Sequence, residues 1–150
     1  MYIKETNGTD RDFHVLISEL EQHLNMLAGG EENRQEYMPH NALHDIHDVF
    51  IAYIDENPVG CASFKQYEEG VAELKRVYVK PDYRGKGIAE QLVNTVSAAA
   101  GKKGFQTLIL ETGKTFTAAV NLYQKLGFVI TDHYEPYIGM EDSVCMRKEL

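Results

Sequence analysis

The sequence predicts a single α/β domain of the α+β type, with about seven strands flanked by about four helices. Short runs rich in β-branched and aromatic residues alternate with longer runs whose apolar residues recur at three- and four-residue spacing. The 150 residues, 43% of them hydrophobic, are enough to bury one core. No repeat, low-complexity tract or linker divides the chain, so residues 1–150 are expected to form one domain.

The first elements are a strand and an amphipathic helix. Tyr2 to Glu5 reads as a short strand, and Thr9 with Asp12 forms a capping signal ahead of an apolar stripe. This stripe ends at Gly29-Gly30 and consists of Phe13, Leu16, Ile17, Leu20, Leu24 and Leu27. The following stretch, from Glu31 to His47, is polar and has no clean period, so a short helix and a mobile loop are expected there.

Three strands then follow as an antiparallel meander, at residues 49–54, 59–67 and 71–79, with turn residues between them. In the third strand the apolar positions change parity across Lys75-Arg76. A β-bulge explains this change, because one extra residue turns the following side chains to the other face.

The remaining elements alternate between helix and strand. A helical stripe runs from Ile88 to Gly101 and a buried strand covers residues 106–111. Thr115 or Thr117 is expected to cap a helix through Leu126. Two further strands are predicted at residues 128–133 and 143–147.

Composition and charge exclude several classes of function. A net charge of −8 argues against non-specific nucleic-acid binding, which needs clustered Lys and Arg. No apolar run approaches the roughly 20 residues that span a bilayer, and the N-terminus lacks a signal peptide. Cys61 and Cys145 lie in apolar stretches without CxxC spacing, so they are expected to be buried thiols. A cytoplasmic protein is predicted.

A strand leads through a basic, glycine-rich turn into a helix at Pro81 to Ala89. Free N–H groups and the macrodipole at a helix start favour an anion, and glycines allow a phosphate to approach the backbone. The third glycine of the dinucleotide fingerprint is replaced by Glu90, and no Walker A sequence is present. An ordinary glycine turn before a helix is the alternative, and it leaves the neighbouring Arg84 unexplained.

The segment Arg84-Gly85-Lys86-Gly87-Ile88-Ala89 resembles the R/Q-x-x-G-x-G/A signature of the GNAT superfamily of acyl-CoA-dependent N-acetyltransferases. The segment Glu73 to Val79 is similar to the family's fourth strand. Residues 119–128, AVNLYQKLGF, resemble its A-x-x-x-Y-x-x-x-G-F block. The resemblance spans residues 49 to about 133 and implies a mixed, mostly antiparallel central sheet.

The resemblance also implies acetyl-CoA as cosubstrate. The backbone N–H groups of the signature loop would hold its pyrophosphate. Val77 and Val79 would pair with the pantetheine arm where the fourth strand parts from the fifth, and the Val77 N–H would donate to the oxyanion. The loop residues with this role are Arg84, Gly85, Lys86, Gly87, Ile88 and Ala89.

Two residues take catalytic roles by resemblance. Tyr123 matches the family's general acid, although an aromatic on the buried face of a helix is the simpler interpretation. Glu73 stands where relatives often place a base acting through water, with a solvent-facing strand residue as the alternative and Glu111 as the rival base. Phe116 departs from the family, whose members usually carry Asn there.

The predicted function is acetyl transfer to a primary amine of a small molecule, with a peptide or protein amine as an alternative acceptor. An inactive acetyl-CoA sensor and a site for another nucleotide are competing hypotheses. A homodimer is possible through exposed strand edges. No metal site is predicted, although His40, His44 and His47 raise the question. Acidic residues in the acceptor region could favour a cationic amine, with a solvated loop as the plain alternative: Glu31, Glu32, Glu36 and Asp45, with Tyr37 and Asp48.

Overall fold

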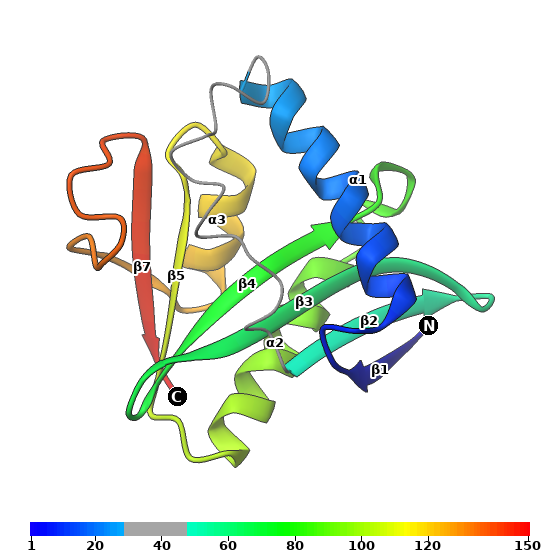
Figure 1. Ribbon diagram of the computed structural model, residues 1–150, viewed down its shortest axis with the longest axis horizontal. Helices are drawn as coiled ribbons and strands as arrows, with labels where there is room; N and C mark the ends of the chain where they lie inside the picture. Colours follow the sequence, from blue (N-terminus) through cyan, green and yellow to red (C-terminus); the bar gives the residue numbers. More distant parts are fainter. Residues whose placement is uncertain (29–47) are drawn as a thin grey trace.

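The computed structural model describes residues 1–28 and 48–150, and its centre is one seven-stranded sheet in the order β1-β2-β3-β4-β5-β7-β6 (Figure 1). The helix expected within residues 31–47 lies outside the described residues. The strands are β1 (Tyr2–Thr6), β2 (Asp48–Ile54), β3 (Asn57–Glu68), β4 (Val71–Val79), β5 (Thr107–Gly113), β6 (Val129–Thr131) and β7 (Ser143–Glu149), and the helices are α1 (Arg11–Ala28), α2 (Ile88–Lys102) and α3 (Thr117–Lys125).

The sheet is mixed and mostly antiparallel, as predicted. Strands β1 to β4 form an antiparallel meander, and β5 and β6 both pair antiparallel with β7. The single parallel pair among the described strands is β4 with β5, because the chain crosses through α2 between them. Strand β6 is shorter than the predicted 128–133.

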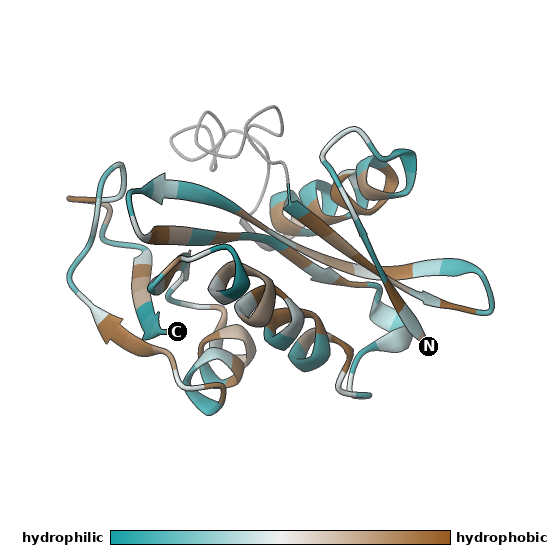
Figure 2. Ribbon diagram, turned by 90° about the horizontal axis from the view of Figure 1, so that it is seen from below, coloured by the Kyte–Doolittle hydropathy of each residue, from teal (hydrophilic) through white to brown (hydrophobic). Residues whose placement is uncertain are grey.

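The helices cover opposite faces of the sheet, with α1 on one face and α2 and α3 on the other (Figures 1 and 2). Under α1, the predicted stripe residues Phe13, Leu16, Ile17 and Leu20 pack against β2, β3 and β4. On the opposite face, α2 and α3 pack over a larger apolar cluster. Each such side chain contributes about 1.5–3 kcal/mol when fully buried. Cys61 and Cys145 are buried free thiols, as expected.

Both predicted helix caps are one residue from their true positions. Asp10 caps α1, because its carboxylate accepts the Asp12 N–H at 2.8 Å, whereas Thr9 bonds to Asn7. Phe116 occupies the N-cap of α3 without a side-chain cap bond, and Thr117 is the first helical residue. Spacing in the sequence does not show which of several neighbouring residues lies at the helix end.

Candidate active site

The parity change in β4 is a β-bulge. Between the pairs Cys61–Tyr78 and Ser63–Lys75, β4 has one residue more than β3. Arg76 absorbs the extra residue with a left-handed φ of +59°. After the bulge Val77 packs against the same cluster under α2 and α3 as Leu74 does before it, so the inward positions change from even to odd numbers and the predicted change of parity is confirmed.

Strand β4 parts from β5 soon after they pair. Their register covers only Val71–Glu73 against Thr107–Ile109. Further along, the Lys80 N–H bonds to the Val59 carbonyl on β3 at 2.9 Å. Because neighbouring residues of a strand point their backbone groups in opposite directions, those of Val79 point into the gap between the two strands.

The glycine-rich turn has the conformation that a phosphate cradle needs. Gly85 and Gly87 have φ of +77° and +79°, and Gly87 is the N-cap of α2. A Cβ added to either glycine would meet no atom within 4 Å. These glycines are therefore required for backbone conformation, and the space above them is open to an anion at the helix start.

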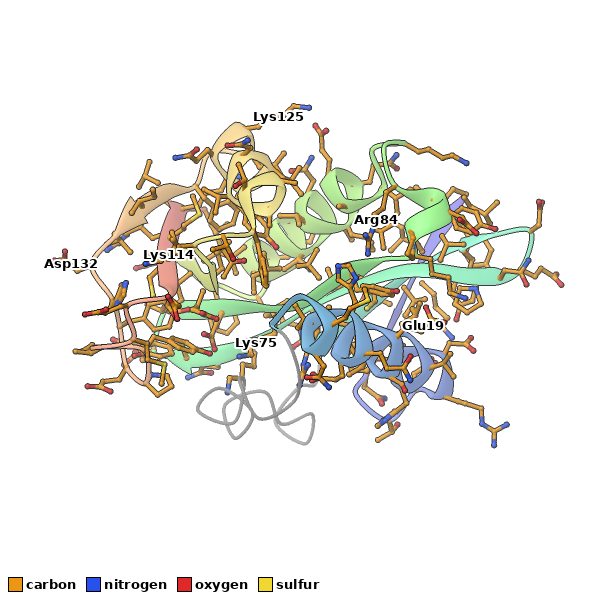
Figure 3. All side chains as sticks on the ribbon, turned by 90° about the horizontal axis from the view of Figure 1, so that it is seen from above. Glu19, Lys75, Arg84, Lys114, Lys125 and Asp132 are labelled. Carbon is orange, nitrogen blue, oxygen red and sulfur yellow. The ribbon has the colours of Figure 1, made fainter. Side chains whose placement is uncertain are left out.

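A cleft of about 280 Å³ lies beside this turn. At the cleft, Lys125 of α3 forms an ion pair with Glu90 of α2 at 3.1 Å. In Figure 3, Lys125 lies on the side of the sheet opposite Lys75. The lining residues are Val79, Tyr83, Arg84, Gly85, Gly87, Ile88, Ala89, Glu90, Leu122 and Lys125.

Two predicted residues differ in how they meet this cleft. The Arg84 side chain turns back onto β4, where its Nε donates to the Val79 carbonyl at 2.9 Å. The Lys86 ammonium lies 5.3 Å from the centre of the Tyr83 ring, and Lys86 does not line the cleft. The side chains of both residues are therefore directed at protein groups, Arg84 at β4 and Lys86 at Tyr83.

Tyr123 belongs to the buried face of α3, 8% exposed, beside the Phe128 ring at 5.8 Å. Burial raises the pKa of its phenol, so the group keeps its proton at neutral pH. Within residues 1–28 and 48–150, no protein group forms a hydrogen bond with its hydroxyl. Tyr123 is thus an aromatic core residue whose polar end has no protein partner there.

Glu73 lies on the other face of the sheet and is not solvent-facing, since it is only 3% exposed. One carboxylate oxygen accepts the Tyr134 phenol at 2.7 Å, and the other lies 3.8 Å from the Lys75 ammonium. Lys75 itself donates to the Tyr137 phenol at 3.3 Å. Burial lowers the pKa of Lys75, partly offset by the Glu73 carboxylate.

Glu111 lies two residues beyond Ile109, which pairs with Glu73, so the two carboxylates share a face of the sheet. Glu111 accepts a hydrogen bond from Ser143 at 2.7 Å. Burial raises the pKa of Glu111, although this bond and Lys75 oppose the shift. The structure therefore gathers both predicted bases into one buried polar cluster.

Sequence reasoning missed the tyrosines of this cluster. Tyr134 and Tyr137 follow β6 in a stretch without period, and only their three-residue spacing between two strands marks them. Phe116, the departure from the family pattern, packs near Gly113, where an added Cβ would lie 3.1 Å from its ring. The aromatic ring thus places the start of α3 on the end of β5.

Several acceptor-side predictions fall on residues 29–47, outside the described part of the chain. These are the acidic residues from Glu31 to Asp45, Tyr37 and the three histidines. Asp48 is described and does not fit, because it forms an ion pair with Lys103 at the end of α2. The described residues contain no group of three potential metal ligands. Among them, too, no helix is long and apolar enough to cross a membrane.

Comparison with known proteins gives consistent results. The family model described as Acetyltransferase (GNAT) family matches residues 16–128. An IAA acetyltransferase of Azospirillum brasilense is 32% identical over 90% of this chain and 88% of its own. An uncharacterized N-acetyltransferase of Schizosaccharomyces pombe is 29% identical over 93% and 87%.

Solved structures agree with this family. A Klebsiella pneumoniae protein described as an acyl-CoA N-acyltransferase superposes with a TM-score of 0.81 at 29% identity, covering 99% of this chain and 97% of its own. A GNAT family acetyltransferase of Elizabethkingia anophelis, with acetyl-CoA bound, has a TM-score of 0.65 at 26% identity over 77% and 83%. With its bulged β4, parted β5 and glycine turn, the chain belongs to the GNAT family of acetyltransferases.

Proposed function

We propose that this protein transfers the acetyl group of acetyl-CoA to a primary amine of a small molecule. The observation that carries the proposal is the open pair of left-handed glycines at the start of α2, beside the 280 Å³ cleft. Such a helix start binds phosphate. The acetyl-CoA bound in the Elizabethkingia anophelis relative supports the same ligand here. A peptide or protein amine is the alternative acceptor.

The backbone from Arg84 to Ala89 would hold the pyrophosphate, with Gly85 and Gly87 leaving it room. The backbone groups of Val77 and Val79 would pair with the pantetheine arm, because β5 has left that edge of β4. The Val79 carbonyl, which accepts from Arg84 Nε, has a second lone pair for the arm. The arm would then replace the missing strand, and its amides would gain hydrogen-bond partners.

Acetyl-CoA supplies the thioester, and the protein's own groups handle the protons. In the proposed reaction the amine nitrogen bonds to the acetyl carbon as the carbon–sulfur bond breaks. Glu73 takes the amine proton through water, and Tyr123 gives its proton to the leaving sulfur. The Val77 N–H donates to the acetyl oxygen as charge develops on it.

The burial of the two cysteines supports direct attack of the amine on acetyl-CoA in a ternary complex. Cys61 and Cys145 are both 0% exposed, and burial raises the pKa of the Cys61 thiol to about 12. A thiol in this state is a poor nucleophile. An acyl-cysteine step is therefore not part of the proposal.

Glu111 is the second candidate for the base. Its raised pKa means that it holds a proton more firmly than an ordinary carboxylate, which favours proton uptake near neutral pH. Glu73 is proposed first because it belongs to β4, the strand that would hold the pantetheine arm.

The test of the cofactor site is thermal unfolding with and without acetyl-CoA. At an acetyl-CoA concentration about 100 times the dissociation constant, linkage predicts roughly 2.7 kcal/mol of stabilisation. Each kcal/mol raises the Tm of a protein of 150–250 residues by about 2–4 °C. Gly87→Glu is expected to abolish the rise, because it places a carboxylate in the phosphate cradle.

Gly104→Glu is the matched control. Gly104 also has a left-handed φ, of +93°, and open space around its Cβ position, but it lies beyond the far end of α2. This variant should lose a similar amount of stability and keep the full shift. No shift in the wild-type protein at saturating acetyl-CoA would refute the proposed cosubstrate, and a shift retained in Gly87→Glu would refute its site.

A further inference from the structure

Three tyrosines gather where the connection between β6 and β7, residues 132–142, meets β3 and β4. Tyr134 makes edge-to-face contacts with Tyr67 of β3 at 5.1 Å and with Tyr137 at 5.5 Å between ring centres. The Tyr67 phenol donates to the Glu135 carbonyl at 2.7 Å. This bond ties the connection to β3, so Tyr134 is held from both sides.

The polar end of Tyr134 points at one atom. Its phenol donates to Oε2 of Glu73 at 2.7 Å, while Oε1 of Glu73 lies 3.8 Å from the Lys75 ammonium. Burial and the Glu73 carboxylate raise the pKa of Tyr134, so its phenol stays protonated and remains a donor. A donor fixed in this way holds the carboxylate that it contacts in one orientation.

We propose that Tyr134 is a positioning residue, which holds the Glu73 carboxylate in the orientation of a base. The inference rests on the proposed function for the role of Glu73, and on the structure alone for the contact. A base must point at its proton before reaction, and the single short bond from a braced phenol fixes this orientation. Tyr134 does not itself touch the substrate in this scheme.

Other charged and titratable groups also face Glu73. Lys75 lies on the same strand as Glu73, Lys65 of β3 is the direct cross-strand partner of Glu73, and Glu111 lies on β5. Tyr137 contacts Lys75 from the connection. Since Tyr134→Phe leaves all of these groups in place, any effect of the variant on Glu73 comes from the loss of the Tyr134 hydroxyl.

The first experiment follows the Glu73 carboxyl carbon by NMR in protein labelled with ¹³C-glutamate, assigned by its loss in Glu73→Gln. In Tyr134→Phe the carboxyl resonance is expected to move and broaden at constant pH, because the carboxylate has lost the donor that fixes its orientation. An unchanged resonance in Tyr134→Phe would overturn the proposal.

Tyr53→Phe is the matched control. Tyr53 also donates its phenol to a carboxylate at 2.7 Å, that of Asp12. It lies on β2 under α1, away from Glu73. This variant should leave the Glu73 carboxyl resonance unchanged, and a similar change in both variants would mean that the effect is a general response to losing a buried phenol.

The second experiment measures thiol release from acetyl-CoA with whichever of lysine, spermidine, tryptamine and an alanine-terminated peptide reacts fastest. Tyr134→Phe is expected to lower kcat about 10- to 100-fold with the KM for acetyl-CoA unchanged. In a Glu73→Gln background the same substitution should have little further effect.

These outcomes separate the inference from the function it rests on. If Glu73→Gln keeps full turnover, the base assignment of the proposed function falls, while the carboxyl resonance still reports whether Tyr134 holds the carboxylate. If Glu73→Gln is slow but Tyr134→Phe is not, only the inference falls. An additive loss in the double variant would show that Tyr134 acts by a route other than Glu73.

Discussion

Tyr123 packs as the simpler interpretation of its sequence position expects. Its ring fills the core beside Phe128, and burial of its phenol raises the pKa, so the proton is retained. Core packing explains the ring and leaves the hydroxyl without a structural task among the described residues. The task that we propose for the hydroxyl is proton donation to the leaving sulfur.

Tyr123→Phe keeps the ring and removes the donor. It should bind acetyl-CoA as the wild type does in calorimetry, with a fall in kcat of about 100-fold or more, because general acid catalysis contributes that much. An unchanged rate would remove Tyr123 from the mechanism. Acetyl-CoA binding by a wild-type protein that turns over no amine would favour the sensor hypothesis instead.

At the scale of the elements, the pairing of β3 with β4 sets the position of the β4 edge beside the cleft, because the bulge lies in β4. Gly60 of β3 faces Val79 at this point, and an added Cβ would lie 2.9 Å from the Tyr78 carbonyl. Since that atom belongs to the backbone, the two strands would have to move apart. The position of the predicted pantetheine edge therefore depends on a glycine outside the signature loop.

Gly60→Ala is expected to destabilise the protein by about 1–3 kcal/mol, as overpacking typically does, and to weaken acetyl-CoA binding because Val79 shifts. Denaturation by urea and calorimetry would measure the two effects. Gly101→Ala is the control, since Gly101 lies within α2 with nothing within 4 Å of its Cβ position. That variant should be neutral or gain up to about 1 kcal/mol. A Gly60→Ala protein as stable as the wild type would contradict the close approach.

Across the molecule as a whole, one ion pair joins α1 to the bulge. Arg76, whose side chain is 6% exposed, contacts Glu21 of α1 through Nη1. The left-handed φ of Arg76 costs about 1–2 kcal/mol for a non-glycine residue, so the contact stabilises an unfavourable backbone. The helix and the bulged strand are in this way coupled across the face that carries Glu73.

Arg76→Ala is expected to lose about 1–3 kcal/mol of unfolding free energy, because a charge-assisted contact is removed while the strained backbone stays. Arg76→Gly should lose about 1 kcal/mol less, since glycine accepts this conformation. Lys103→Ala breaks a pair whose lysine side chain is half exposed, and it should cost about 0–1 kcal/mol. Equal losses in Arg76→Ala and Lys103→Ala, measured in urea, would contradict the coupling.

Local signals in the sequence are enough to predict the elements and the glycine-rich turn before α2. Apolar spacing places most helices and strands to within about two residues of their observed bounds. The parity change at Lys75-Arg76 likewise locates the bulge, because the face that a side chain occupies depends on the strand's own backbone. The left-handed glycines are predictable for the same reason, since their function depends on their own backbone conformation.

The surroundings of Glu73, in contrast, depend on the tertiary structure. Tyr134 is separated from it by 61 positions, and the bond between them exists because β6 and β7 bring the connection back over β4. The same folding directs the Arg84 side chain to the Val79 carbonyl, although its charge suggests a contact with phosphate. It also places Asp48 beside Lys103. Periodicity reports which face a residue occupies, whereas the partner of a buried polar group depends on distant segments meeting in three dimensions.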